Sequence, residues 1–202
     1  MSFRPNHKYT PEEYLALERE AQSKSEYYAG EVFAMSGATE AHVLIVGNVF
    51  AKIHAKLMGR PCKVYMSDMR VKVSETGMYT YPDLSALRGE PRFEDNLHDT
   101  LLNPTVLIEV LSKSTESYDR GARFGHYRAI ESLQEYVLVS QESPRVELFT
   151  RQPRGGWLLT DAIGLEASLR IASLDCDLPL AEVYDKVTFE VPAEFAGSAT
   201  PR

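Results

Sequence analysis

The sequence lacks the features that mark secreted, membrane-spanning or zinc-clustered proteins. Its two cysteines, Cys62 and Cys176, lie far apart and form no Cys-x-x-Cys pair. This usage is typical of a reducing compartment and offers no zinc cluster, so both are interpreted as buried or incidental thiols. No apolar run approaches the roughly 20 residues that span a bilayer, and residues 1–8 lack the apolar core of a secretory signal. We therefore expect a cytoplasmic protein with no membrane partner.

The sequence also has fewer basic than acidic residues. The chain has 22 Lys and Arg against 29 Asp and Glu, which gives a formal net charge of −7, and its sequence pI is near 5.3. A general nucleic-acid-binding protein is expected to carry a basic surface, so the charge argues against that class. The negative net charge is still compatible with an enzyme that has a local basic groove.

What is present is an ordinary globular composition. Of the 202 residues, 44% are hydrophobic and 25% are charged, which is typical of a globular domain with a sizeable core. We expect a single domain over residues 9–189. Residues 1–8 are interpreted as a flexible N-terminal arm. Residues 190–202 show no apolar period and predict a disordered tail.

Helix and strand signals alternate along the chain and predict an α/β fold, a mixed β-sheet flanked by helices with added β-hairpins. Residues 69–73 alternate apolar and basic, so one face of that strand is expected to meet solvent. Residues 105–111, the helix after them and residues 135–139 predict a parallel, right-handed βαβ unit. The predicted helices cover 11–21, 40–58, 115–130 and 180–184; the predicted strands cover 26–33 (a hairpin), 64–66, 69–73, 79–87, 105–111, 135–139, 146–149, 156–160 and 169–171, with a surface loop at 88–104.

Two acidic residues interrupt apolar runs in the middle of the chain. Asp83 falls near the middle of the strand predicted at 79–87, and Glu109 falls near the end of the strand at 105–111. A carboxylate buried in such a run is costly unless a cation, a donor or a metal meets it. If the two strands are neighbours, the carboxylates converge, and a hard divalent cation such as Mg²⁺ is the natural counter-ion. Such an ion activates water and neutralises charge on a phosphate.

The basic partner of this pair is displaced along the chain. Leu111 occupies the position two residues after Glu109, where the Lys of a Glu-x-Lys motif would share its face of the strand. Lys113 and Arg123 are the nearest substitutes, and Arg123 lies on a helix that we expect to fold back over the sheet. The alternative is that Asp83 is a turn former and that a half-exposed Glu109 pairs with Arg123, because ion-pair networks imitate active sites.

The remaining polar and aromatic candidates carry weaker signals. His42 and Asn48 are six residues apart on a helix and do not share a face closely, so we interpret them as capping and packing residues. Tyr118 and Tyr127 are interpreted as core residues. The basic positions between 120 and 128 either contact a phosphate backbone or form a solvated helix face.

Several short motifs together resemble one protein family. Each motif is weak by itself, but their order and spacing from Tyr9 to about Tyr184 are specific. They resemble the Uma-type (Uma-two) family of restriction-endonuclease-like proteins, formerly a domain of unknown function, in the PD-(D/E)XK nuclease superfamily. The motifs are Tyr9-Thr10-x-x-Glu13-Tyr14-Leu15, Glu26-Tyr27-x-x-Gly30-Glu31, His42-x-x-Ile45-x-Gly47-Asn48, Ser67-Asp68-x-Arg70-Val71, Tyr81-Pro82-Asp83, Asn103-Pro104, Glu109-Val110-Leu111-Ser112-x-Ser114-Thr115, Tyr118-Asp119-Arg120-Gly121 and Ser132-Leu133-x-Glu135-Tyr136.

The resemblance implies a restriction-endonuclease-like core with Asp83 and Glu109 as metal ligands and Glu26 as a further acid. Family members usually carry Lys in the Asp-Arg-Gly-x-Lys-Phe segment, whereas this sequence has Arg123 there. Because Arg stays protonated and spreads its charge over a fork, it suits a phosphate clamp better than proton transfer. Activity is therefore expected to be altered, reduced or lost relative to family members that carry the Lys.

Three functions follow from these residues. The first is a Mg²⁺- or Mn²⁺-dependent endonuclease that hydrolyses phosphodiester bonds of DNA, with the Val110 carbonyl as a third metal ligand. The second is a catalytically impaired nucleic-acid- or protein-binding module that retains the fold. The third is a metal-dependent hydrolase with another substrate. Superfamily members often pair to cut two strands, so we also expect a homodimer, built through exposed strands near 64–73 or 145–160.

Overall fold

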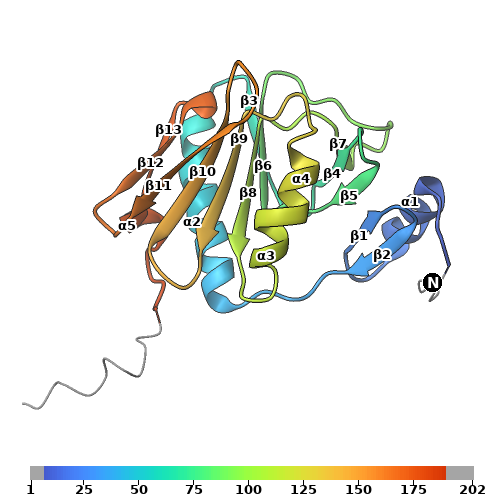
Figure 1. Ribbon diagram of the computed structural model, residues 1–202, viewed down its shortest axis with the longest axis horizontal. Coiled ribbons are helices and arrows are strands. Elements are labelled where there is room, and N and C mark those ends of the chain that lie inside the picture. Colours follow the sequence, from blue (N-terminus) through green and yellow to red (C-terminus); the bar gives the residue numbers. More distant parts are fainter. Residues whose placement is uncertain (1–6, 190–202) are drawn as a thin grey trace, which may run out of the picture.

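A six-stranded mixed sheet forms the centre of the computed structural model, which describes residues 7–189 (Figure 1). Its central strand β8 is buried along its whole length. β8 runs parallel to β9 and antiparallel to β6, so the two strands expected to carry Asp83 and Glu109 are neighbours. In spatial order the strands are β11 (Trp157–Ile163), β10 (Arg145–Arg151), β9 (Glu135–Ser140), β8 (Val106–Leu111), β6 (Leu84–Arg88) and β3 (Cys62–Met66).

A second, five-stranded sheet and a small two-stranded sheet complete the β-structure. The five-stranded sheet contains the predicted N-terminal hairpin, and the pairing of β4 with β7 is its parallel step. Its spatial order is β2 (Glu31–Ala34), β1 (Ser25–Tyr28), β5 (Met78–Thr80), β4 (Arg70–Val73) and β7 (Thr100–Leu101); the two-stranded sheet pairs β12 (Ser168–Ile171) with β13 (Cys176–Pro179).

The two longest helices, α1 and α2, begin where their capping residues predict. Thr10 accepts a hydrogen bond from the N–H of Glu13 in a capping box, and Thr39 caps the longest helix. Gly59, just after that helix, has a left-handed φ of +72°, as expected for a glycine that ends a helix. The helices are α1 (Pro11–Glu20), α2 (Glu40–Leu57), α3 (Glu116–Tyr118), a π-helix (Asp119–Arg123), α4 (Phe124–Tyr127), a 3₁₀ turn (Ala172–Leu174) and α5 (Leu180–Val183).

Two hydrophobic cores lie on opposite faces of the six-stranded sheet. Alternate residues of β8 pack in the two cores. Val106, Ile108 and Val110 pack in the core that includes α2. Leu107 and Leu111 pack in the core that includes α4 and strands of the five-stranded sheet. Because side chains alternate along a strand, Glu109 shares the face of Leu107 and Leu111, and it meets the α3–α4 segment rather than α2.

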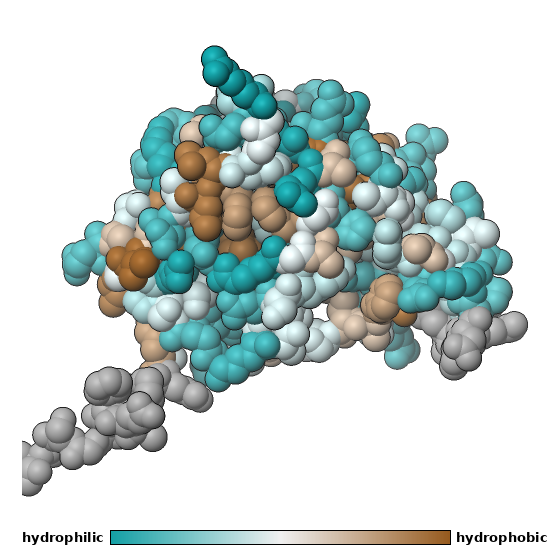
Figure 2. Space-filling model, in the orientation of Figure 1, coloured by the Kyte–Doolittle hydropathy of each residue, from teal (hydrophilic) through white to brown (hydrophobic). Residues whose placement is uncertain are grey.

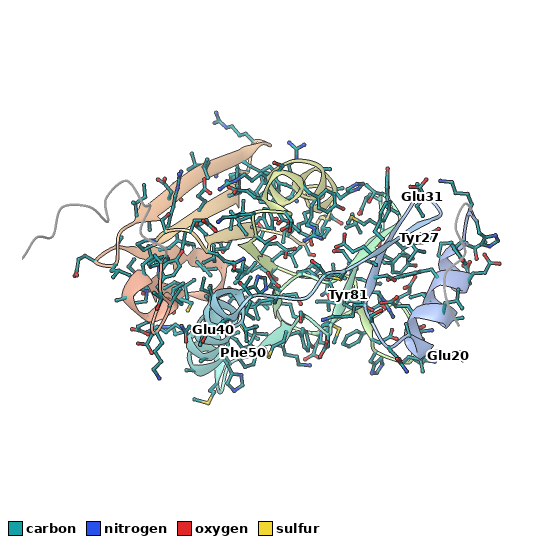
Figure 3. The ribbon with its side chains drawn as sticks, turned by 90° about the horizontal axis from the view of Figure 1, so that it is seen from below. Glu20, Tyr27, Glu31, Glu40, Phe50 and Tyr81 are labelled. Carbon is teal, nitrogen blue, oxygen red and sulfur yellow. The ribbon has the colours of Figure 1, made fainter. Side chains whose placement is uncertain are left out.

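A third core of tyrosines attaches α1 to the five-stranded sheet. Tyr14 stacks on Tyr27 with ring centroids 5.0 Å apart, and Tyr79 closes the group. The hairpin turn between β1 and β2 has positive φ at both central residues, Ala29 (50°) and Gly30 (83°), as in a type I′ turn. Figure 3 shows the hairpin residues Tyr27 and Glu31 toward one end of the molecule, well away from Glu40 and Phe50 of α2.

The fold corrects four of the sequence-based expectations. Residues 79–87 are two strands in different sheets, β5 and β6, with Asp83 in the link between them. The loop expected at 88–104 contains β7. Arg70 on β4 is buried against Tyr81 and Asp99, so solvent reaches that face of the strand only in part, at the half-buried Lys72. The helix expected at 115–130 ends at Tyr127 and is interrupted by the π-helix.

The ends of the expected domain are only partly described. At the N-terminal side, Lys8 forms an ion pair with Glu31, and the N–H of Tyr9 donates to the Gly30 carbonyl at 2.9 Å. Residues 1–6 of the expected arm and the expected tail, 190–202, lie outside the described residues. Within 7–189, none of the helices has the length and apolar character needed to cross a membrane.

Asp99 anchors α1 to β4 and supplies a pH-dependent prediction. Its carboxylate lies 2.7 Å from Arg19 Nε and 3.0 Å from Arg70 Nη2. The hydrogen bond from Arg19, opposed by burial and helped by Arg70, lowers the pKa of Asp99 from 3.8 to about 2. The lowered pKa means that this pairing stabilises the fold above pH ~4 and is lost as the pH falls from about 4 to about 2.

We expect Asp99→Asn to lower the free energy of unfolding by about 1 kcal/mol at pH 7. The full shift would correspond to about 2 kcal/mol, and solvent screening reduces it because the side chain is 33% exposed. Urea unfolding from pH 7 to pH 2 measures the difference, which should vanish at the acid end. Asp68→Asn is the matched control, because Asp68 is 95% exposed. A difference that stays constant down to pH 2 would contradict this account.

Candidate active site

A cluster of acidic side chains lies where the two large sheets meet. Asp83 stands in the link that leaves β5 of one sheet and enters β6 of the other. Its N–H lies 3.3 Å from Glu109 Oε2, and its Oδ2 accepts a hydrogen bond of 2.7 Å from the N–H of Val110. The two carboxylates that were expected to converge are thus in direct proximity, with Glu109 only 3% exposed.

Arg123 returns to the carboxylates from the helical segment after β8, as the sequence predicted. Its Nη1 lies 3.2 Å from Glu109 Oε1 and 2.9 Å from Asp119 Oδ1. Its Nη2 forms an ion pair with Glu26. The guanidinium is 7% exposed and is therefore enclosed by three carboxylates.

The π-helix explains how Asp119 and Arg123 come to face the same point. Both residues are buried within this five-residue element, and they form an i, i+4 ion pair. π-helical turns are rare and are frequent at functional sites. The Leu111 position, which lacks the usual basic residue, is filled by a core side chain instead, so the positive charge reaches Glu109 from the helix.

Glu26 reaches the cluster from β1 and is held on two sides. Its Oε1 accepts hydrogen bonds from the Thr80 hydroxyl on β5 and from Arg123. β1 and β5 are antiparallel neighbours in the five-stranded sheet. Because Glu26 lies 97 positions from Arg123 in the sequence, only this sheet pairing brings it to the site.

Electrostatics in the cluster favour protonation or a further cation. Burial raises the pKa of Glu109 well above its ordinary value; Arg123 opposes this, and the charges of Asp83 and Asp119 add to it. Burial likewise raises the pKa of Asp119. Burial alone would lower the pKa of Arg123, but the acidic neighbours, led by Glu109, raise it overall, so the guanidinium keeps its charge.

The donor set suits a hard divalent cation. Arg123 Nε is buried without a hydrogen bond among the described residues, whereas Asp119 Oδ1 is engaged by Arg123 Nη1 at 2.9 Å. No group of three or more His, Cys, Asp or Glu side chains in residues 7–189 is already arranged to hold a metal. The Asp83–Glu109 pair nevertheless offers two carboxylates, and Mg²⁺ commonly binds through one or two carboxylates and several waters.

Comparisons with known proteins identify the family. Residues 11–181 match the family model Uma2, described as "Putative restriction endonuclease". The chain belongs to the Uma2 family. Two curated relatives from Synechocystis support this: "Uncharacterized protein sll1609" is 36% identical over 163 residues, covering 81% of this chain and 92% of that protein. "Uncharacterized protein slr1290" is 33% identical over 187 residues, covering 92% and 96%.

A solved structure confirms the fold that the resemblance implied. The crystal structure of "a putative nuclease belonging to DUF820" from Anabaena variabilis superposes with a TM-score of 0.73. The alignment covers 89% of this chain and 99% of that one at 18% identity. This restriction-endonuclease-like α/β fold is therefore common to the two chains, and the family description supports a nuclease-like function.

The sequence patterns did not identify all the residues of the acidic cluster in this Uma2 protein. His42, interpreted as a capping and packing residue, places its Nε2 2.9 Å from Asp83 Oδ1, and Gln141 lies 3.4 Å from its other ring nitrogen. Tyr127 is buried, as expected, and also donates a 2.8 Å hydrogen bond to Glu109 Oε1. The i, i+4 spacing of Asp119 and Arg123 was a usable signal, whereas nothing local connects His42 with Asp83.

Other sequence candidates take structural roles in this Uma2 chain. Asn48 donates to the carbonyls of Val183 and Asp185, as expected for a packing residue. Arg120 pairs with Glu116 and Glu147. Tyr118 is not a core residue, because it is 37% exposed and its ring lies 4.9 Å from the Arg123 guanidinium carbon.

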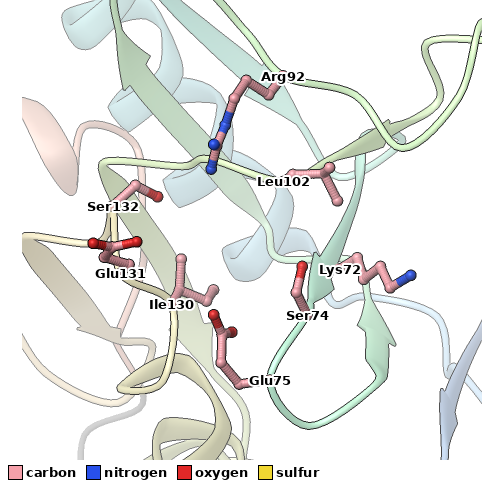
Figure 4. A pocket seen from close by; sticks show the side chains of 8 residues that line it. All are labelled: Lys72, Ser74, Glu75, Arg92, Leu102, Ile130, Glu131 and Ser132. Carbon is pink, nitrogen blue, oxygen red and sulfur yellow. The ribbon is translucent and has the colours of Figure 1, made fainter.

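A small pocket elsewhere on the Uma2 fold does not coincide with the cluster. It has a volume of about 50 Å³ and lies beside the turn that joins β4 and β5 (Figure 4). None of the cluster's carboxylates lines it, and its walls are polar side chains such as Lys72, Glu75 and Glu131 with two aliphatic residues. We therefore place the candidate active site at the cluster.

Proposed function

We propose that this protein is a metal-dependent endonuclease that hydrolyses phosphodiester bonds of DNA. Asp83 and Glu109 hold Mg²⁺ or Mn²⁺, with the Val110 carbonyl as a third ligand. Arg123 stands in place of the usual Lys and stabilises negative charge on the phosphate, and Glu26 is a further acid of the site.

The observation that carries this proposal is the charge balance around Arg123. Its guanidinium contacts Glu26, Glu109 and Asp119, and Asp83 lies against Glu109. If all four acids are ionised, one positive charge meets four negative charges in a buried space. Such an excess is costly without a further cation, and a divalent ion of oxygen-ligand chemistry supplies what is missing.

The backbone of β8 supports Val110 as the third ligand. Its N–H donates to Asp83 Oδ2. In a β-strand, a residue that uses its N–H toward one neighbour also presents its C=O to that side. The Val110 carbonyl is therefore directed to the same side as Asp83.

The side chains around the ligands fix their orientation. His42 and the N–H of Val110 occupy one lone pair on each oxygen of Asp83, while Tyr127 and the N–H of Asp83 do the same for Glu109. Such supporting hydrogen bonds hold carboxylates in one rotamer and tune their affinity for metal. A bound metal would supply an activated water and would neutralise charge that develops on the phosphate.

The open edges of the six-stranded sheet support the homodimer that we expected. β11 is an edge strand, and Leu158, Leu159 and Ile163 on it are 53%, 48% and 65% exposed. Figure 2 shows hydrophobic side chains gathered on the side of the molecule that carries β9–β11. Exposed apolar edges of this kind favour association, and a dimer would present two such sites.

A second candidate function is a binding module that has kept the fold and lost catalysis. The arrangement of Arg123 favours it, because both Nη atoms are engaged by carboxylates and an Arg cannot serve as a proton carrier. In this alternative, Arg123 is a resident cation that replaces the metal.

One experiment separates the two functions. The purified protein is incubated with supercoiled and linear DNA in Mg²⁺, Mn²⁺ or EDTA, beside Arg123→Lys. We expect cleavage with either metal and none with EDTA. Cleavage by Arg123→Lys alone would mean an intact scaffold that Arg123 silences. If neither protein cuts DNA, and calorimetric titration detects no binding of Mn²⁺, the binding module is the correct function.

A further inference from the structure

The most exposed aromatic side chains of the protein surround its acidic cluster. Within residues 7–189, Tyr28, Phe33 and Tyr118 are the most exposed of the Phe, Tyr and Trp residues, at 41%, 47% and 37%. They come from the β1–β2 hairpin and from α3, which is far from the hairpin in the sequence. Exposed aromatic side chains scattered singly need no explanation, but three around one site do.

Two of them share a sheet face with Glu26. Phe33 is the direct cross-strand partner of Glu26 in the β1–β2 hairpin. Tyr28 lies two residues after Glu26, so it projects from the same face. The intervening Tyr27 projects from the other face and is 5% exposed in the tyrosine core. One face of the hairpin therefore packs in the tyrosine core. The opposite face carries the Glu26 carboxylate and the rings of Tyr28 and Phe33.

The third ring approaches from the opposite element. The Tyr118 ring lies 4.9 Å from the Arg123 guanidinium carbon, and that guanidinium forms the ion pair with Glu26. Tyr28 meets the same helical segment, with its ring 4.5 Å from that of His126 in an edge-on contact. The Glu26–Arg123 pair therefore lies between aromatic rings from two elements.

The charges near the site do not suit a duplex held by its phosphates. Three basic side chains close to the site in the sequence are already paired: Lys113 with Glu142, Arg120 with Glu116 and Glu147, and Arg123 with the cluster. The chain carries a net charge of −7. Affinity for an intact duplex depends mainly on cations that neutralise phosphates, whereas unpaired strands also gain affinity by stacking bases on aromatic rings.

We propose that the substrate is DNA with unpaired bases at the scissile position, held by base stacking on Tyr28, Phe33 and Tyr118. This inference rests on the proposed function, because it specifies the DNA that the same site cuts. A base pair inside a duplex offers no free π-face to these rings. Single strands, flaps and frayed ends present such faces, so they are the substrates that the site selects.

Binding measured without catalysis tests the inference separately from the nuclease activity. Fluorescence anisotropy in EDTA compares three probes of equal length: an oligothymidylate, a duplex, and a strand of abasic sites that keeps the phosphates. We expect the oligothymidylate to bind at least about 10-fold more tightly than the other two, because stacking contributes a factor of about 5 to 100 for each base.

Variants identify the residues responsible. Tyr28→Ala, Phe33→Ala and Tyr118→Ala are each expected to weaken oligothymidylate binding by about 5- to 100-fold, with little change for the duplex. Tyr28→Phe and Tyr118→Phe keep the ring and should retain binding, and they are the variants least able to disturb the fold. Leu97→Ala is the control, because Leu97 is 64% exposed in the loop between β6 and β7, away from the site and from the β11 edge.

The outcomes are distinguishable. Equal or tighter binding of the duplex or the abasic strand, or unchanged binding by the alanine variants, would overturn the inference and leave the proposed endonuclease untouched. A change of mass by light scattering in those variants, without a change in DNA binding, would assign the rings to a protein contact instead. If the protein cuts no DNA but binds single strands in a way that depends on these rings, the stacking surface is upheld and belongs to the binding module.

Discussion

Asp83→Ala is expected to lower metal-dependent DNA cleavage by roughly 1,000-fold. A metal supplies several kcal/mol of stabilisation to the charge that develops on a phosphate, and about 4 kcal/mol corresponds to that factor. The substitution removes a carboxylate that is a proposed ligand and that accepts the 2.7 Å hydrogen bond from the N–H of Val110, whereas it keeps the backbone N–H that lies 3.3 Å from Glu109 Oε2. The rate of nicking of supercoiled DNA in Mg²⁺ measures the loss.

Metal affinity provides the second readout for Asp83. Calorimetric titration with Mn²⁺ should show binding by the wild-type protein and loss of that binding by Asp83→Ala. Asp68→Ala is the control, since Asp68 is 95% exposed and paired only with Lys24 among the described residues. A variant that lost cleavage but bound Mn²⁺ with unchanged affinity would show that Asp83 is not a ligand. Circular dichroism confirms that each variant is folded.

Arg123→Met is expected to lower the free energy of unfolding by about 3–5 kcal/mol at pH 7.5. The substitution keeps most of the side-chain volume but leaves Glu26, Glu109 and Asp119 buried without their cation. Removing one partner of a buried ion pair has a cost of this size. Urea unfolding followed by circular dichroism measures the change.

The pH dependence of the Arg123 effect has a definite sign. Burial already raises the pKa values of Glu109 and Asp119, and removal of Arg123 raises them further. The folded variant then binds protons more tightly than the unfolded chain, so its stability rises as the pH falls. We therefore expect the destabilisation at pH 5 to be smaller than at pH 7.5.

Two controls make the Arg123 prediction specific. Arg128→Met removes an exposed cation from the same segment and should change stability by less than about 0.5 kcal/mol. Mg²⁺ should restore part of the stability of Arg123→Met, because a ligand that binds only the folded state stabilises it. A destabilisation equal to that of Arg128→Met, or insensitive to pH, would contradict the enclosed-cation geometry.

Much of the site followed from local patterns. The apolar run around Glu109 predicted the buried strand β8, and its position between β6 and β9 agrees with that pattern. The helix after β8 was expected to return over the sheet, and it carries Arg123 to Glu109. Both steps depend on short segments adjacent in the sequence, where periodicity and connection rules are informative.

The errors arose where the chain changes sheets. Residues 79–87 were predicted to form one strand. In the structure the strand stops before Pro82 and Asp83, and the residues on either side belong to different sheets. His42 begins a helix whose apolar pattern predicted only packing, and it meets Asp83 across 41 positions. The periodicity of a sequence does not predict such a contact, because the apolar pattern of a helix or strand is the same whichever element packs against it.

The sequence by itself determined the family, the α/β class and the pair of carboxylates, because these depend on motif order and on the cost of burying charge in apolar strands. Only the tertiary structure decided how Glu26, which the resemblance implied, reaches that pair, and that Thr80 and His42 join it. The structure also decided that Asp119 and Arg123 converge through a π-helix and that Tyr28, Phe33 and Tyr118 surround the cluster. These residues come from the five-stranded sheet and two helical segments, and their proximity to Glu109 on the six-stranded sheet depends on how those elements pack, which local sequence patterns do not encode.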